Sequence, residues 1–213
     1  MMFNLPKSTL VKKVIPKNAF DSYTNTKQKK MFGEKVLRMT WTNKLSFDTI
    51  NILGNDVEEI QLFEIELKEK FDAKDLLVII DKAIPYHIIF IVRYYDEYYI
   101  STSAKHIHPT NEDNAVIDYT FLSEWTEEKI FAFDIELKNN LDWVYKTFCL
   151  QFVSVLDNSK NLKEFIETQK NIDGIKREIE KVKLEILRCK QFNKKVELNL
   201  KLKVLQGKLL SIK

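Results

Sequence analysis

Glu64, Glu66 and Lys68 form the pattern in this sequence that is closest to a catalytic motif. They alternate with apolar residues, so on a strand their side chains project from one face. Nucleases of the PD-(D/E)xK type place an acidic residue and a lysine two positions apart on such a strand. There the carboxylate binds Mg²⁺ and the lysine positions or activates the attacking water. A further upstream carboxylate is required, and Asp48 and Asp56 are available for this role.

The same residues also fit an ordinary amphipathic strand, whose solvent-facing side commonly carries Glu and Lys. Such a short pattern is therefore weak support for a nuclease. A Mg²⁺-dependent nuclease with Glu66, Lys68, Asp56 and Glu64 as its catalytic residues stays an alternative. Mg²⁺ is needed only by this alternative, and no cofactor is expected otherwise.

Lys105, His106 and His108 begin a polar segment that also contains Asn111 and Asp113. Two imidazoles two positions apart can face one metal ion on an extended chain, with a neighbouring carboxylate as a further ligand. Lys105 and His106 can equally contact a phosphate or a nucleotide, and the Asn and Asp side chains can simply turn the backbone. These alternatives stay open, and we expect a loop with a binding role.

The composition favours a soluble, cytoplasmic protein and argues against several common enzyme classes. No Gly-x-Gly-x-x-Gly, Walker-type or Gly-x-Ser-x-Gly sequence occurs. Cys149 and Cys189 both fall in helical patterns, so neither a disulfide nor a cysteine-based zinc site is expected. No signal peptide is recognised, and no apolar run approaches the roughly 18 residues of a membrane span. We therefore expect no membrane association.

Periodicity and turn residues predict an α+β body. Helices are expected over residues 19–36, 73–83 and 136–156, and strands over residues 37–45, 57–67, 87–93, 98–102 and 116–121. Asn18 is the expected cap of the first helix, and residues 104–114 are the polar loop described above. This order predicts a mixed sheet with helices on one face, followed by a C-terminal helical hairpin or coiled-coil arm.

The last 55 residues have the pattern of a helical arm, because apolar residues recur at alternating steps of three and four. These seam residues are Ile172, Ile175, Ile179, Val182, Ile186 and Cys189, followed by Leu198, Leu202, Leu205, Leu209 and Ile212. The interval between Cys189 and Leu198 breaks the rhythm. An antiparallel hairpin that turns near Asn193 is favoured because it buries the seam within the chain. A single bent helix would need a partner to cover the seam.

Charge divides the chain into two parts. Residues 160–213 contain 15 Lys and Arg against 7 Asp and Glu, a net charge of +8, and the residues before them contain 19 against 24, a net charge of −5. We expect an α+β body over residues 1–134, a connecting helix over 135–158 and a basic arm over 159–213. Lys194 and Lys195 are candidate contacts to DNA phosphates. The acidic residues interspersed in the arm also fit a solvated coiled-coil face.

Three segments carry a family resemblance: residues 12–21 (KKVIPKNAFD), 81–90 (DKAIPYHIIF) and 111–118 (NEDNAVID). They resemble the DUF4391 family, a domain of unknown function in bacteria and archaea. The resemblance spans most of the chain and is plainest in the amino-terminal body. Its members look to be encoded near helicases and DNA methyltransferases, which implies a restriction-modification or antiphage setting. The resemblance assigns no activity and no catalytic residue.

Together these patterns favour a non-enzymatic accessory or scaffolding subunit of a prokaryotic DNA-processing assembly. We expect the arm to bind a protein, either a helicase or methyltransferase of the same system or a second copy of the chain. DNA is a further candidate partner of the basic arm. The alternatives are the Mg²⁺-dependent nuclease described above and a self-associating coiled-coil protein.

Overall fold

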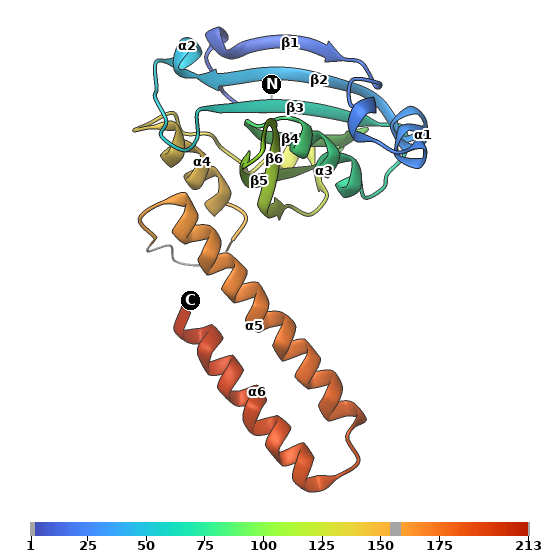
Figure 1. Cartoon of the computed structure of the whole chain (residues 1–213), viewed down its shortest axis with the longest axis vertical. Helices are drawn as coiled ribbons and strands as arrows, with labels where there is room; N and C mark the ends of the chain where they lie inside the picture. Colours follow the sequence, from blue (N-terminus) through green and yellow to red (C-terminus); the bar gives the residue numbers. More distant parts are fainter. Residues whose placement is uncertain (1–2, 154–158, 213) are drawn as a thin grey trace. The chain divides into compact units, whose positions relative to one another are not determined.

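The computed structural model describes residues 3–153 and 159–212 of the chain (Figure 1). The chain divides into two compact units, Met1–Ser154 and Val155–Lys213, which we call the body and the arm. Within the described residues, every helix is too short or too polar to span a lipid bilayer.

Within the described residues, a seven-stranded mixed sheet forms the centre of the body (Figure 1). Six strands follow sequence order across the sheet and the seventh pairs with the fifth: β1 (Leu10–Ile15), β2 (Val36–Ser46), β3 (Glu59–Leu67), β4 (His87–Tyr94), β5 (Glu97–His108), β6 (Asn111–Leu122) and β7 (Thr126–Glu127). β3 and β4 are parallel, and the other paired strands are antiparallel. The predicted α+β class with a mixed sheet is confirmed.

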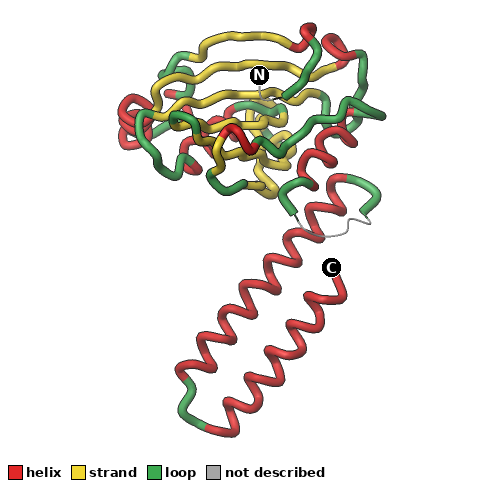
Figure 2. The backbone as a smooth tube through the Cα atoms, turned by 180° about the vertical axis from the view of Figure 1, so that it is seen from behind, coloured by secondary structure: helices red, strands yellow, loops and turns green. Residues whose placement is uncertain are grey.

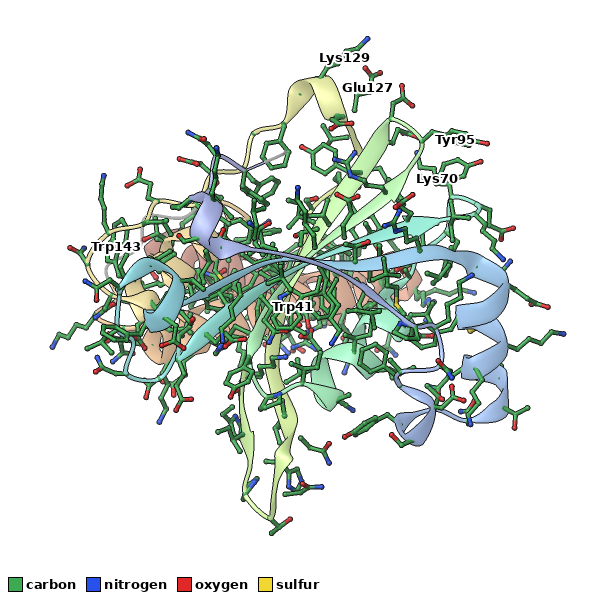
Figure 3. All side chains as sticks on the ribbon, turned by 90° about the horizontal axis from the view of Figure 1, so that it is seen from above. Trp41, Lys70, Tyr95, Glu127, Lys129 and Trp143 are labelled. Atoms are coloured by element: carbon green, nitrogen blue, oxygen red, sulfur yellow. The ribbon has the colours of Figure 1, made fainter. Side chains whose placement is uncertain are left out.

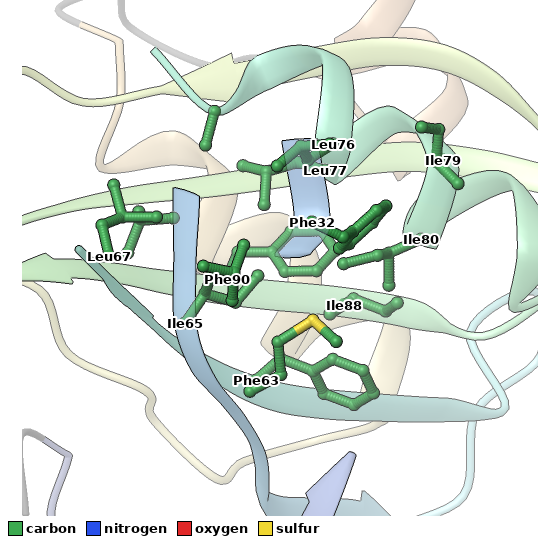
Figure 4. Packing of buried hydrophobic residues seen from close by; sticks show 14 of the residues in the cluster. Phe32, Phe63, Ile65, Leu67, Leu76, Leu77, Ile79, Ile80, Ile88 and Phe90 are labelled. Carbon is green, nitrogen blue, oxygen red and sulfur yellow. The ribbon is translucent and has the colours of Figure 1, made fainter. Parts of the chain in front are cut away.

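The parallel pair β3 and β4 requires a crossover connection, which α3 (Lys74–Ala83) provides. β4 is a nearly continuous apolar run because both of its faces are buried over most of its length. β3 is also buried along most of its length, although it contains Glu and Gln residues. α1 (Thr26–Lys35) and α3 cover one face of the sheet, where Phe63 and Phe90 pack edge to face at 6.1 Å in the main hydrophobic core (Figure 4).

α4 (Leu141–Leu150) packs against the opposite face of the sheet. The Tyr145 hydroxyl lies 2.7 Å from the Thr102 hydroxyl, and the Tyr145 ring lies 4.3 Å from the ring of His87. Thr102 and His87 occupy the strand positions that alternate with those facing α3. The body also contains short helices: η1 (Lys7–Thr9), η2 (Asp21–Tyr23), α2 (Phe47–Ile50) and η3 (Glu128–Ile130).

The first predicted helix begins later than expected, at Thr26. Asn25 caps it, in place of the predicted Asn18: the Gln28 N–H donates to Asn25 Oδ1 at 3.0 Å, and the Gln28 side chain accepts from the Asn25 N–H at 2.9 Å. The residues before this cap form β1 and a short 3-10 helix. β1 was not predicted, because it is an edge strand in which adjacent exposed lysines interrupt the apolar alternation.

The predicted polar loop over residues 104–114 is wrong. β5 continues to His108 and β6 begins at Asn111, so the segment is a long β-hairpin that turns at Pro109 and Thr110. Pairing across the hairpin outweighs the low strand propensity of its Asn and Asp residues, and a short sequence window does not reveal that pairing.

The predicted helix over residues 136–156 is also shorter in the structure. Asn140 ends the preceding loop and caps α4, because its side chain accepts a hydrogen bond from the Trp143 N–H at 2.8 Å. α4 therefore occupies only the middle of the expected connecting helix at 135–158, and residues 154–158 lie outside the described residues.

Two antiparallel helices, α5 (Leu162–Arg188) and α6 (Phe192–Ile212), form the arm (Figure 2). The prediction of a helical hairpin is confirmed. Its turn lies at residues 189–191, just before the predicted position at Asn193.

The apolar seam closes the hairpin as its spacing predicted. Its buried centre consists of Ile179, Val182 and Leu205. Partly buried residues around this centre are Ile175, Ile186, Leu198, Leu202 and Leu209. The heptad pattern is therefore used within the chain, between α5 and α6.

Candidate functional site

Glu64, Glu66 and Lys68 line an open cavity of about 590 Å³ on the body. Its other lining residues are Leu37, Leu67, Arg93, Tyr94 and Tyr95. The cavity lies at the carboxyl ends of the parallel strands β3 and β4, where open sheets with crossover helices commonly bind ligands. Tyr95 projects from the turn between β4 and β5 and holds a left-handed φ of 53° (Figure 3).

Arg93 forms ion pairs with two of the carboxylates beside this cavity, those of Glu64 and Glu128. Its guanidinium donates to both carboxylate oxygens of Glu128, at 2.9 and 3.0 Å, and lies 3.3 Å from Glu64 Oε2. The hydrogen bonds from Arg93 lower the pKa of Glu128. The Lys68 ammonium donates to the Gly33 carbonyl at 2.8 Å. Two of the three motif residues are therefore held by contacts within the body.

The structure does not bring Asp48 or Asp56 to Glu66. Asp56 precedes the start of β3 and Glu66 lies near its end, so more than about 20 Å of strand separates them at roughly 3.3 Å per residue. Asp48 follows β2, whose last residue Ser46 pairs with Glu59 at the same distant end of β3. Among the residues that the structure describes, no cluster of three or more His, Cys, Asp or Glu side chains is arranged to hold a metal ion. In the described part of the chain, neither of the upstream carboxylates considered for the nuclease alternative is thus placed beside Glu66.

Lys105 stabilises the body and is not an exposed binding residue, contrary to the prediction. Its side chain is fully buried, and its ammonium donates to Asp81 Oδ1 at 2.9 Å and to the Asp81 and Ile84 carbonyls at 2.8 Å each. These acceptors use all three N–H donors of the ammonium. Burial raises the pKa of Asp81 and lowers that of Lys105, and the charge of each partner opposes the shift.

His106 and His108 lie on the β5–β6 hairpin and have separate contacts. His106 Nδ1 lies 2.7 Å from an oxygen of Asp118 on the neighbouring strand. His108 Nδ1 accepts a hydrogen bond from the Thr110 N–H, at 3.3 Å, within the turn. His106 and His108, which were candidates to bind one ligand together, thus each contact another residue of the hairpin.

The remaining predicted binding residues are divided between this hairpin and the arm. Asn111 pairs with His108 at the end of the hairpin. The side chain of Asp113 lies outside the described residues. Lys194 and Lys195 are exposed at the start of α6, in the arm.

A buried polar network in the body was not predicted. Asp81 accepts a hydrogen bond from the Ser103 hydroxyl at 2.6 Å, in addition to its pair with Lys105. On the other side of the sheet, His87 is buried against Tyr145. Burial, followed by the charge of Lys105, lowers the pKa of His87 to about 3. The available sequence signal was an aspartate on the apolar side of the predicted helix over residues 73–83.

α6 carries a second apolar face, on the side opposite its contact with α5. At about 100° per residue, its members fall within about 60° of the point opposite the seam. We call these residues the outer face: Phe192, Val196, Leu200, Val204 and Leu210, each between 44% and 79% exposed. A helix at a protein surface normally has one apolar stripe and a polar opposite side. The outer face is therefore the main unexplained apolar surface of the arm.

The helix that bears the outer face is basic. α6 contains 5 lysines and one acidic residue, Glu197. One of the lysines, Lys201, pairs with Glu178 of α5 at 2.8 Å. Because such exposed pairs contribute little to stability, the seam rather than charge holds the hairpin together.

The structure thus defines an α+β domain that carries a helical hairpin arm, and comparison of the sequence assigns both parts to one family. The family described as "Domain of unknown function (DUF4391)" matches residues 3–209. The chain belongs to this family, as the resemblance predicted. No curated protein and no solved structure matches the chain.

Proposed function

We propose that this chain is a non-enzymatic accessory subunit that joins a larger protein through its arm. The outer face of α6 carries the proposal, because a helix that is apolar on two opposite sides is normally buried between neighbours. Exposed apolar surface with a polar rim is typical of protein interaction sites. α5 covers one side of α6, and the partner covers the other.

The proposed setting is a restriction-modification or antiphage assembly in the cytoplasm of a prokaryote. Its support is the resemblance to a family whose members look to be encoded beside helicases and DNA methyltransferases, so a protein of this kind is the proposed partner. Lys194 and Lys195 add a contact to DNA phosphates in such an assembly. A protein is the primary partner, because phosphates offer no apolar surface to cover the outer face.

The native mass of the chain in its host tests this function. A tagged full-length chain, expressed at its natural level, is separated by size from a gently prepared extract. We expect it in an assembly much heavier than the 25.3 kDa of one chain. The double variant Leu200→Glu/Val204→Glu is expected to leave that assembly, whereas Asn199→Glu/Gln206→Glu, which adds the same charge beside the outer face, remains in it. A wild-type chain that migrates alone would contradict the proposal.

A further inference from the structure

The outer face has the dimensions of one packed helix. It runs from Phe192 to Leu210, which corresponds to about 27 Å of helix at 1.5 Å per residue. Its members follow one side of α6 within an arc of about 120°. A second helix laid along this side would extend the two-helix hairpin to a three-helix bundle, with α6 at its centre.

Gly207 lies within the outer face, between Val204 and Leu210. A Cβ atom placed on this glycine meets no atom within 4 Å, so the packing of the arm itself leaves room for a larger residue at this position. Glycine destabilises a helix interior relative to alanine, so glycine at this position does not stabilise α6 itself. A small residue at this position lets a neighbouring helix approach the backbone of α6 more closely.

Lysines lie within and beside the outer face. At about 100° per residue, Lys203 falls inside the outer face and Lys208 lies to one side of it, whereas Lys195 and Lys201 lie closer to the seam. Glu197 alone in α6 carries the opposite charge. In paired helices the charges beside the apolar seam select the partner, and opposite charges are favoured. The complementary helix therefore carries acidic residues beside its apolar stripe.

A second copy of the chain fits the outer face poorly. Two copies of α6 present the same lysines beside the interface in either orientation, and each arm has a net charge of +8 over residues 160–213. Like charges placed beside a helical interface select against that pairing. A helix with acidic edges removes this repulsion.

We propose that the outer face of α6 docks an acidic amphipathic helix of another protein along Phe192–Leu210. The inference rests on the proposed function and adds the chemistry of the partner. That partner segment has apolar residues at steps of three and four, flanked by Glu or Asp.

Two designed helical peptides of equal length test the inference on the full chain. Both carry the same Leu and Ile stripe; one has Glu at the flanking positions and the other has Lys. Binding is followed by the fluorescence anisotropy of the labelled peptides at moderate salt. We expect the chain to bind the acidic peptide about tenfold more tightly than the basic one, or better.

Two variants of equal charge locate the binding surface. Leu200→Glu is expected to weaken binding of the acidic peptide about tenfold or more, because it places a charge in the centre of the outer face. Gln206→Glu adds the same charge on the lateral side of α6 and should weaken binding by less than about threefold. Circular dichroism verifies that both variants keep the helix content of the wild type.

Each other outcome overturns the inference. Equal affinity for the two peptides contradicts the acidic charge of the partner, and a chain that binds neither peptide contradicts an amphipathic helix as the occupant of the outer face. A chain that is dimeric alone and becomes monomeric with Leu200→Glu identifies a second copy as the occupant. Binding to anionic vesicles or duplex DNA that Leu200→Glu abolishes assigns the face to lipid or nucleic acid.

Failure of this inference and failure of the proposed function can be told apart. If neither peptide binds but the chain remains in a heavy native assembly that Leu200→Glu/Val204→Glu disrupts, the accessory function stands and the acidic helix is wrong. If the wild-type chain migrates alone in the host extract, the accessory function fails whatever the peptides do.

Discussion

Leu198 and Leu200 lie two residues apart on α6 and face opposite environments. Leu198 packs in the seam with residues of α5, whereas Leu200 is 61% exposed. Two residues turn an α-helix by about 200°, so the two leucines project in nearly opposite directions. The seam leucine stabilises the hairpin, and the outer leucine is available to a partner.

Truncation of a seam leucine should weaken the arm, and truncation of an outer leucine should not. Leu205→Ala removes a buried side chain and is expected to destabilise the hairpin by about 2 kcal/mol. Leu200→Ala should change its stability by less than about 0.5 kcal/mol, because the side chain is exposed. Hydrogen exchange of the α5 and α6 amides in the full chain measures both effects. Equal effects would show that the two faces are not distinct.

The arm illustrates what the sequence can predict. Its seam repeats over many turns, so local spacing alone identified both helices and favoured the hairpin. The second apolar face was not recognised, because Val196, Leu200 and Val204 follow one another at steps of four and look like ordinary members of a long helix. Their exposure became visible only when α5 was placed against the other side of α6.

Loss of one partner of the buried Asp81–Lys105 ion pair should destabilise the body more than loss of both partners. Lys105→Met leaves the Asp81 carboxylate buried without its main partner and is expected to cost about 3–5 kcal/mol of unfolding free energy. Asp81→Leu/Lys105→Met removes both charges and should recover most of that loss, to within about 1 kcal/mol of the wild type. Urea unfolding of the three proteins measures the comparison. A double variant as unstable as Lys105→Met would mean that the two residues are not coupled.

Acidification should destabilise the body through His87. The folded state lowers the pKa of this imidazole from 6.5 to about 3. At pH values between these two, the unfolded chain therefore binds more protons than the folded chain. Stability is therefore lost as the pH falls, by up to about 1.4 kcal/mol per pH unit and about 2 kcal/mol by pH 5.

Urea unfolding at pH 7.5 and pH 5 measures this loss. His87→Gln should remove about 2 kcal/mol of the difference between the two pH values, because glutamine does not titrate. His108→Gln, which changes a histidine outside the core, is the matched control and should keep the wild-type difference. A loss on acidification that is the same in all three proteins would contradict the role of His87.

The two cysteines should react very differently with a thiol reagent. Both are free, but Cys149 is buried in α4 and Cys189 lies at the turn between α5 and α6. Burial raises the pKa of the Cys149 thiol and reduces its thiolate fraction. We expect one thiol to react in the native chain and two in denaturant, with peptide mass analysis assigning the native product to Cys189. Native labelling of both at one rate would indicate that α4 is not packed as described.

The body shows where sequence reasoning fails and why. The central strands were predicted from local patterns, because β4 is a nearly continuous apolar run and β3 alternates apolar and polar residues toward its end. The proposed catalytic set was not brought together, because Asp56 precedes β3 and Glu66 lies near its end, so the extended strand holds the two carboxylates apart. Lys105 looked like a surface residue because nothing near it in the sequence shows that Asp81 lies against it.

Site-specific photo-crosslinking along α6 in living host cells tests the docking claim most directly. A photoreactive residue is placed in the full chain at Val196, Leu200 or Val204 on the outer face, and at Asn199 or Gln206 beside it as matched controls. We expect the three outer positions to crosslink to one acidic helical segment of another protein, and the two lateral positions to give far less product. Equal products from both sets, or crosslinks to a second copy of this chain, would contradict the claim.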